Sequence, residues 1–217
     1  MSLRSAIRTI FTLGHGAVGG LSEETAGTDP IALFKTWFDA AKRSTIFLPE
    51  TMTVATATKD GVPSARMMLL KGVDQDGFVF FTNYQSRKAT ELDENPRAAL
   101  VFHWAILERQ VRVEGTLAKL PTEASAAYFH SRARGSQIGA WASEQSRPLA
   151  RREDLERRER EHRERFEGVA VPLPPFWGGY RVTPVRIEFW QGRLNRLHDR
   201  LRFDRQGAAW QVTRLFP

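Results

Sequence analysis

From about residue 50 onward, the chain consists of short β-prone runs separated by turn residues. Lys59-Asp60-Gly61 and Asp74-Gln75-Asp76-Gly77 are typical of tight turns. Helices do not alternate regularly with these runs, so a parallel βαβ architecture is disfavoured. We expect a mainly antiparallel β fold with peripheral helices, of the α+β type, whose sheet closes into a barrel. The expected strands cover residues 53–58, 64–73, 78–82, 98–104, 110–117, 181–190, 196–203 and 210–215.

Four helices are expected around these strands. The first begins at Asp29-Pro30, an N-cap followed by proline at the first helical position. Within it Phe34, Trp37 and Ala41 recur at helical spacing, which predicts one buried face. The other helices are expected at residues 86–94, 122–132 and 151–167, with a polar loop at 133–150.

The charge pattern of the helix expected at 151–167 bears on whether the net positive charge of the chain indicates a nucleic-acid partner. Lys and Arg number 32 against 25 Asp and Glu, a net charge of +7 that could indicate a nucleic-acid partner. This segment is the densest in charge, yet its seven arginines and seven acids balance. It is interpreted as a solvated, self-paired helix rather than an RNA-binding arm, and no nucleic-acid partner is expected. The acid-first i,i+4 pairs are Asp154/Arg158, Glu156/Arg160, Glu159/Arg163 and Glu161/Arg165.

Residues 29–217 are expected to form a single domain, and residues 1–28 a flexible N-terminal arm. Residues Gly14 to Gly19 match the dinucleotide pattern G-x-G-x-x-G, but no apolar helix follows them, so no dinucleotide site is expected. The arm has no acid before Glu23 and carries basic and apolar residues, which leaves a short targeting helix as an alternative.

Cysteine is absent, which excludes disulfides, thiolate metal sites and a cysteine nucleophile. The same absence fits a reducing compartment, and a cytoplasmic location is expected. No apolar run approaches the ~20 residues that a membrane-spanning helix needs, so no membrane partner is expected. The five histidines show no ligand spacing, and no metal site is expected.

Cations cluster at the ends of the expected strands and helices. Arg66 and Lys71 flank an apolar run, and their spacing places them on opposite faces, so they are expected to serve different partners. Arg87 and Lys88 open a short helix, where main-chain N–H groups already favour an anion. Taken singly, each pair could equally be solvated surface charge.

Two further groups combine cations with aromatic residues. Tyr128, Arg132 and Ser136 can converge on a phosphate, to which they would offer two hydroxyls and a planar guanidinium. In an extended run, positions 196, 198 and 200 share one face, where two arginines and a histidine would repel each other without an anionic or electron-rich ligand. These groups suit a flat ring system with a phosphate tail, but periodicity alone does not name the ligand.

Nine ordered segments of the chain resemble the pyridoxine/pyridoxamine 5′-phosphate oxidase family. The resemblance runs from about residue 29 to residue 217. It implies a homodimeric, FMN-binding split β-barrel with two FMN sites at the subunit interface. The segments are RMMLLKG (66–72), FFTN (80–83), SRK (86–88), ERQVRVEG (108–115), YFHSR (128–132), SQIGAW (136–141), FWGGYRV (176–182), EFWQG (188–192) and NRLHDR (195–200).

The resemblance also implies which residues bind. The FMN phosphate is implied at Arg66, Arg87 and Lys88, beside Thr82. The other residues implied to contact FMN are Met67, Leu70, Lys71, Phe81, Gln110, Gln145, Ser146, Trp190 and Arg200. The substrate phosphate is implied at Lys71, Tyr128, Arg132 and Ser136. Arg196 and His198 match residues that lie over the substrate's pyridine ring, and they are the implied catalytic pair.

The activity that the resemblance implies is oxidation of pyridoxine or pyridoxamine 5′-phosphate to pyridoxal 5′-phosphate. The substrate's C4′ carbon gives a hydride to flavin N5, O2 is the acceptor, and H2O2 is the product. Two features depart from the family pattern. The family often has an N-terminal tyrosine that closes over the substrate, whereas residues 1–28 contain none. An acid near the substrate in some members falls at Leu48, with Glu50 two residues on, so no general base is assigned.

Two alternatives remain beside this function. A related FMN oxidase that acts on phenazine precursors would share the FMN residues without needing the substrate-phosphate set. A split-barrel protein that binds flavin without turnover belongs to another class of function. Formation of peroxide on addition of pyridoxine phosphate would separate the oxidase from the binding protein.

Overall fold

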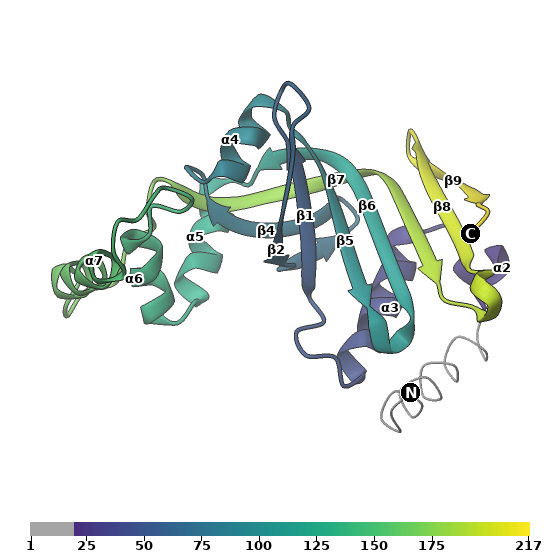
Figure 1. Ribbon diagram of the computed structural model, residues 1–217, viewed down its shortest axis with the longest axis horizontal. Coiled ribbons are helices and arrows are strands. Elements are labelled where there is room, and N and C mark those ends of the chain that lie inside the picture. The colour runs from purple at the N-terminus through teal and green to yellow at the C-terminus, as the bar shows by residue number, and fades with distance from the viewer. Residues whose placement is uncertain (1–19) are drawn as a thin grey trace.

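The computed structural model describes residues 20–217, and within them nine strands form one antiparallel sheet (Figure 1). The sheet has the order β2-β1-β5-β6-β7-β4-β3, and β8 and β9 extend it from β7. The strands are β1 (Thr51–Ala57), β2 (Pro63–Leu69), β3 (Gly72–Asp74), β4 (Gly77–Asn83), β5 (Arg97–Trp104), β6 (Arg109–Lys119), β7 (Trp177–Gln191), β8 (Asp199–Gln206) and β9 (Ala209–Arg214).

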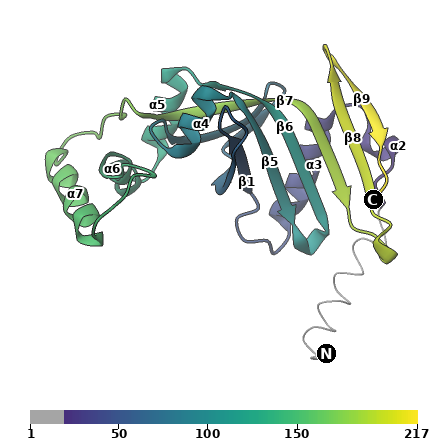
Figure 2. The same ribbon diagram turned by 45° about the horizontal axis from the view of Figure 1, so that its top comes forward.

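The helices gather at the ends and on one side of the sheet. The α5, α6 and α7 helices lie at one end of the molecule, and α2 lies beside the β8–β9 hairpin at the other (Figures 1 and 2). The helices are α2 (Glu23–Ala26), α3 (Pro30–Arg43), α4 (Arg87–Glu94), α5 (Thr122–Ser131), α6 (Arg134–Ala142) and α7 (Arg152–Arg165), with 3-10 turns η1 (Ala105–Leu107) and η2 (Leu194–Arg196).

The long strand β7 connects these two ends. Along one edge it pairs with β6, and along the other it pairs first with β4, up to Val182, and then with β8, from Arg186. The residues between include Pro184, which has no N–H to donate, and the β6 register shifts beside it at Glu114/Gly115. A Cβ on Gly115 would lie 2.3 Å from the Thr183 carbonyl oxygen, so this approach of the strands requires glycine.

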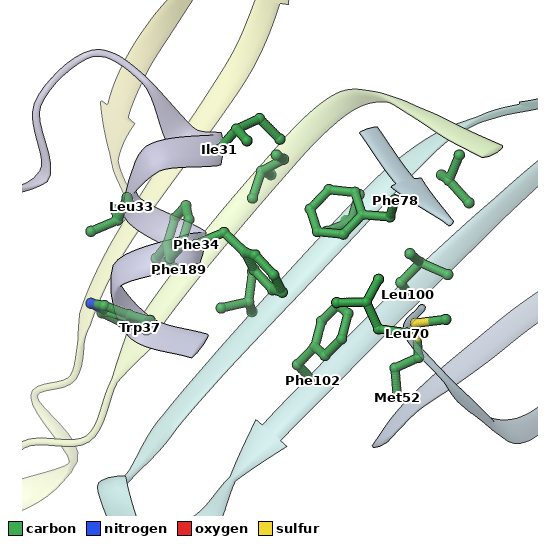
Figure 3. Close-up of a cluster of buried hydrophobic side chains, with 14 of the residues drawn as sticks. Ile31, Leu33, Phe34, Trp37, Met52, Leu70, Phe78, Leu100, Phe102 and Phe189 are labelled. Atoms are coloured by element: carbon green, nitrogen blue, oxygen red, sulfur yellow. The ribbon is translucent and has the colours of Figure 1, made fainter. Parts of the chain in front are cut away.

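The main core lies where α3 packs against the sheet. Phe34 is fully buried and meets the rings of Phe78 and Phe102 edge-on, both with centroids 4.9 Å away (Figure 3). Trp37, one turn later, meets Phe189 at 5.2 Å. The helix begins where expected, because Asp29 Oδ1 accepts from the main-chain N–H groups of Ile31 and Ala32.

The expected fold class, mainly antiparallel β with peripheral helices, is confirmed, but three local predictions were wrong. The run at 64–73 is two strands, β2 and β3. The predicted loop at 133–150 contains α6, whose apolar residues Ile138 and Ala142 are buried despite the polar surroundings. The last-but-one strand begins at Asp199 rather than at 196, and Arg196 lies in the preceding turn η2. The side chains at 196, 198 and 200 therefore do not share one face of a strand.

The described part of the predicted N-terminal arm is packed. Leu21 and Ala26 are buried, and Ser22 and Thr25 form a capping box at the start of α2. Residues 1–19, including the glycine pattern and the possible targeting helix, lie outside the described residues. No residue of α7 is fully buried, although His162 packs against Trp141 of α6. Of the four predicted pairs α7 forms Glu159–Arg163, while Arg158 binds Glu144 instead.

Candidate functional site

The first cluster of the candidate site surrounds the amino group of Lys88, which α4 holds beside β4. Lys88 Nζ donates to Thr82 Oγ1 (2.9 Å), Ser86 Oγ (3.0 Å) and Gln145 Oε1 (2.7 Å). Burial, followed by the charge of Arg66, lowers the pKa of Lys88 to about 8. Thr82 Oγ1 also donates to Gln145 Oε1 at 3.1 Å, so two donors converge on one acceptor. A phosphate oxygen is an acceptor of the same kind, and a stronger one because it is charged.

A buried carboxylate, Glu91, joins the other two implied phosphate-binding cations. Arg87 Nε lies 2.8 Å and Arg66 Nη2 3.4 Å from its oxygens. Burial acts to raise the pKa of Glu91, but hydrogen bonds from Ser64, Thr56 and Arg87 and the charge of Arg66 outweigh it and lower the pKa to about 2. Glu91 is therefore ionised at neutral pH, and it orients two arginines beside Lys88.

A cavity of about 500 Å³ opens next to this cluster. Lys71, Tyr128, Arg132 and Ser136, the four residues implied for the substrate phosphate, all line it. Lys71 lines this cavity, whereas Arg66 lies beside Glu91. The two do not share one strand, because β2 ends at Leu69, so their different partners remain a prediction. The full lining is Met67, Met68, Leu69, Lys71, Phe81, Thr82, Asn83, Tyr128, Arg132, Ser136, Gly139, Ala140, Ser143, Gln145 and Trp177.

Arg132 provides the clearest sign of an anion site in this cavity. Its Nη1 is buried and has no hydrogen-bond partner within residues 20–217. The guanidinium lies over the Trp177 ring, 4.8 Å from the centroid, and burial lowers its pKa. An unpaired buried donor costs about 1–3 kcal/mol, more when charged, so the geometry suits an incoming anion.

An aromatic wall completes this side of the cavity. Phe81 stacks on Tyr128 with ring centroids 4.0 Å apart and on Trp177 with centroids 5.5 Å apart. The three rings come from β4, α5 and the start of β7, so the sheet fixes their common orientation. Stacked rings beside cations suit a planar ligand with an anionic tail.

Five of the remaining implied residues, Gln110, Trp190, Arg196, His198 and Arg200, form a second group at the other end of β7. The rings of Trp190 and His198 lie 4.6 Å apart, and Gln110 pairs across β6 with Trp190. Arg200 Nε donates to the buried carboxylate of Glu188 at 2.9 Å. Arg196 lies exposed in the turn before β8, with a left-handed φ of 63°. His198 Nδ1 accepts from the Arg193 main-chain N–H at 3.1 Å.

A single chain holds these two groups far apart. Thr82 pairs with Gly178 near the start of β7, whereas Gln110 and Arg200 pair with Trp190 near its end. Twelve residues of strand, at about 3.3 Å each, separate positions 178 and 190, which is roughly 40 Å along the strand. The two groups therefore lie near opposite ends of β7 within one chain.

Three other residues implied to contact FMN differ in location and burial. Met67 lines the cavity and is 62% exposed. Leu70 is buried at 5% exposure and packs in the main core, so its side chain belongs to the core. Ser146 is exposed, with a left-handed φ of 75°, next to Gln145.

Sequence reasoning missed Glu91, Glu188 and Trp177. Glu91 lies one helical turn after Arg87, a spacing that could have indicated the pair. Glu188 on β7 contacts Arg200 on the neighbouring strand β8, and Trp177 at the start of β7 lines the cavity. Both come near the other site residues only because distant segments pair in the sheet. Within residues 20–217, no group of three or more His, Asp or Glu could hold a metal ion, and no helix is long and apolar enough to cross a membrane.

Comparison with solved structures defines the class of protein. A pyridoxamine 5′-phosphate oxidase-related, FMN-binding protein from Nostoc punctiforme aligns over 87% of this chain and 98% of its own, with a TM-score of 0.69 at 17% identity. At that identity the likeness concerns the fold alone, which is a split barrel.

Comparison of sequences then identifies the family: this chain belongs to the pyridoxamine 5′-phosphate oxidases. The family model of that name matches residues 38–164, and the pyridoxine 5′-phosphate oxidase C-terminal dimerisation region matches residues 177–217. The Rubrobacter xylanophilus pyridoxine/pyridoxamine 5′-phosphate oxidase is 60% identical over 91% of each chain. The Colwellia psychrerythraea enzyme of the same name is 51% identical over the full length of both. FMN as cofactor and the homodimer are thereby confirmed.

A second structural relative belongs to phenazine chemistry. PhzG from Burkholderia lata, solved in complex with tetrahydrophenazine-1-carboxylic acid, has a TM-score of 0.87 at 32% identity and covers 93% of this chain and 100% of its own. This relative therefore combines the scaffold of this chain with a phenazine carboxylic acid as its bound ligand.

Proposed function

We propose that this chain oxidises pyridoxine 5′-phosphate or pyridoxamine 5′-phosphate to pyridoxal 5′-phosphate, with O2 as acceptor and H2O2 as product. The observation that carries the proposal is the cavity in which Lys71, Tyr128, Arg132 and Ser136 meet. It offers two cations and two hydroxyls to one ligand group, and Arg132 Nη1 has no protein partner there among the described residues. A phosphate monoester, with a charge of about −1.5 to −2, satisfies such a set.

The residues around Lys88 fit the phosphate of FMN. Lys88, Thr82, Arg66 and Arg87 supply its donors, and Glu91 holds the two arginines in place. Gln110, Trp190 and Arg200 of the other group are assigned to the rest of the flavin, together with Gln145 and Ser146. When bound, FMN supplies the hydride acceptor and the route to O2.

The protein's own part in the reaction is to hold and orient the substrate. Arg132 and Lys71 fix the phosphate remote from the reacting carbon, which leaves the ring in one place. Arg196 and His198, from the second group, lie over the ring and orient its C4′ toward the flavin. No general base is assigned.

The wide separation of the two groups supports a site shared between subunits. Arg66, Lys88 and Arg132 come from one protomer, and Trp190, Arg196 and His198 come from its partner. Each homodimer then has two equivalent sites, as two-fold symmetry requires. A cytoplasmic location remains a prediction from the cysteine-free composition.

The second candidate function is oxidation of a phenazine precursor, which the likeness to PhzG favours. The ligand bound to that protein is a carboxylic acid with one negative charge and no phosphate. It would not require the complete Lys71, Tyr128, Arg132 and Ser136 set, and for that reason we place it second.

One assay separates the candidates. The FMN-loaded protein is given pyridoxine 5′-phosphate, pyridoxamine 5′-phosphate, unphosphorylated pyridoxine or a reduced phenazine carboxylate, and both pyridoxal phosphate and peroxide are followed. We expect turnover of the two phosphates with one peroxide per product. Turnover of the phenazine compound alone would reverse the assignment, and flavin binding without turnover of any compound would leave a binding protein.

The substrate-phosphate assignment predicts a specific kinetic change for Arg132→Ala. Because the phosphate contact is the same in the ground state and the transition state, KM should rise more than kcat falls. Loss of a charged hydrogen bond of about 1.5–3 kcal/mol corresponds to roughly a 10- to 150-fold rise in KM. Arg132→Lys keeps the charge but loses the planar guanidinium, so its KM should lie between those of the wild type and Arg132→Ala. A fall in kcat with KM unchanged would remove Arg132 from the phosphate site.

A further inference from the structure

The turn that carries Arg196 and His198 has little apolar packing to hold it. Leu194 is 56% and Leu197 69% exposed. Asn195 and Arg196 both have left-handed φ values, 57° and 63°, which L-residues adopt at a cost. Such a turn keeps one shape only if polar contacts fix it, because neither burial nor local backbone preference does so.

The contacts that fix it close the base of the turn. The Arg193 main-chain N–H donates to His198 Nδ1 at 3.1 Å, and Arg193 Nε lies 3.5 Å from Asp199 Oδ2. Residues 193 and 199 are thereby joined on either side of the turn. Asp199 directly follows His198 in the chain, so the position of its carboxylate constrains His198. Arg200, on the other side, is held independently by Glu188 and the Phe216 carbonyl.

Asp199 is in turn fixed from two distant segments. Its Oδ1 accepts from Arg214 Nη1 at 3.1 Å, at the end of β9, and its Oδ2 accepts from the Leu21 main-chain N–H at 3.2 Å. Arg214 grips Glu23 with two nitrogens, at 2.9 and 2.6 Å, and donates to the Leu21 carbonyl at 3.0 Å. A two-nitrogen grip on a carboxylate is more directional than a single ion pair.

The N-terminal segment that contacts Asp199 and Arg214, residues 21–26, is itself packed against the rest of the molecule. Leu21 is 5% exposed and belongs to the main core, and α2 lies beside the β8–β9 hairpin in both views (Figures 1 and 2). The alternating acid and base side chains, Glu23, Arg214, Asp199 and Arg193, therefore run from an anchored N-terminal segment to the base of the turn. We refer to these four residues as the clasp.

We propose that the clasp is a positioning device for the reaction, in which Asp199 and Arg214 hold the 193–199 turn so that Arg196 and His198 reach the substrate in one geometry. The clasp touches neither the Lys88 cluster nor the cavity around Arg132. Cutting it should loosen the turn, lower kcat, and leave the affinity for FMN phosphate and the grip on the substrate phosphate nearly unchanged. The proposal rests on the proposed roles of Arg196 and His198.

The test is Asp199→Asn, which keeps the shape of the side chain and removes its charge. Misplacement of reacting groups lowers kcat steeply, and we expect a fall of about 10-fold, with KM and FMN affinity changed by less than about 3-fold. Amide hydrogen exchange at residues 193–198 should speed up relative to β5 and β6. Asp74→Asn, which cuts the Arg181–Asp74 ion pair at the other end of β7, is the control and should leave kcat unchanged.

A double variant shows whether Asp199 acts through the turn. In an Arg196→Ala background, the effect of Asp199→Asn should shrink, since one of the two residues that it positions is gone. An undiminished effect in that background would overturn the proposal, and so would an unchanged kcat in Asp199→Asn. Glu23→Gln, at the exposed outer end, serves if Asp199→Asn does not fold, and it should lower kcat by about 2- to 3-fold in the same manner. An unchanged kcat in Glu23→Gln would overturn the part of the clasp that reaches α2.

The outcome is separable from that of the proposed function. If Arg196→Ala itself leaves kcat unchanged, the role of Arg196 fails and the clasp fails with it. If Arg196→Ala lowers kcat while Asp199→Asn does not, the clasp alone is overturned.

Discussion

Arg196 occupies a backbone position that glycine would fill at lower cost. At a φ of 63°, replacing a non-glycine residue by glycine relieves steric strain, while replacing it by alanine keeps the Cβ and the strain. We therefore expect Arg196→Gly to be more stable than Arg196→Ala by about 1 kcal/mol in denaturant unfolding. Both variants lack the guanidinium, and both should lose about 10-fold or more in kcat per bound flavin. Equal kcat in wild type and both variants would show that Arg196 supports only the turn.

Lys88 makes FMN binding dependent on pH. Its pKa in the free protein is about 8, lowered first by burial and then by Arg66, against the raising influence of Glu91. A bound phosphate favours the charged form, so binding takes up a proton once the pH exceeds 8. The dissociation constant of FMN should then rise by up to about 10-fold per pH unit above 8. Riboflavin, which has no phosphate, is the control in the same titration and should show no such slope.

The Lys88 amino group affects the stability of the fold in the opposite direction from FMN affinity. The pKa of an unfolded lysine is 10.5, so between pH 8 and 10.5 the unfolded chain binds more protons than the folded one. The contribution of Lys88 to apo-protein stability therefore rises with pH across this window. Stability of the apo-protein and affinity for FMN should diverge as the solution becomes alkaline.

At the scale of elements, α3 stabilises the curled sheet. Phe34 is fully buried between Phe78 and Phe102, so Phe34→Ala should leave a cavity and lower the free energy of unfolding by about 3–5 kcal/mol. Phe47→Ala removes an 87% exposed ring outside the core and should change stability by less than about 0.5 kcal/mol. Chemical denaturation of the two variants in parallel measures the difference. Similar losses in both would contradict the central position of α3.

The sequence predicted those elements whose periodicity is strong. The spacing of Phe34, Trp37 and Ala41 and the N-cap at Asp29 located α3 correctly, because local chemistry determines both. The α6 helix was missed because its four buried or half-buried apolar positions stand among Gly, Ser and Gln, which are weak helix signals. The turn at Arg196 was missed because the residue adopts a backbone conformation against its own preference, and tertiary contacts impose it.

The candidate site was predictable only in part for a related reason. Cations at element ends can be read from the chain, and Lys71, Tyr128, Arg132 and Ser136 do meet in one cavity. Glu188, the acidic partner of Arg200, lies on a neighbouring strand, so no local pattern marks it as part of a site. Glu91 has one local signal, its position one helical turn after Arg87, but its contact with Arg66 depends on the fold. The separation of the site into two groups depends on the length and register of β7, which periodicity does not give.

At the scale of the whole molecule, the shared site predicts that two impaired variants restore activity when mixed, if activity is assayed at a substrate concentration well below the KM of Arg132→Ala. Arg132→Ala and Arg196→Ala damage different groups, which lie toward opposite ends of β7. A hybrid dimer of the two has one site with both defects and one site with neither. After joint unfolding and refolding of equal amounts, about a quarter of the wild-type activity should appear, since half the dimers are hybrids and each has one intact site. Activity no higher than the mean of the separate variants would place the whole site within one chain.

The length of β7 also has a genetic consequence. A chain that carries both substitutions, Arg132→Ala and Arg196→Ala, would contribute one damaged group to each site of any dimer it enters. Paired with a wild-type chain, it would leave no intact site, so the double lesion would act as a dominant inhibitor when both are expressed together. The same two lesions on separate chains would compensate for each other. The two substitutions would thus inhibit when one chain carries both and compensate when they lie on separate chains, because each chain would contribute one group of residues to each of two sites.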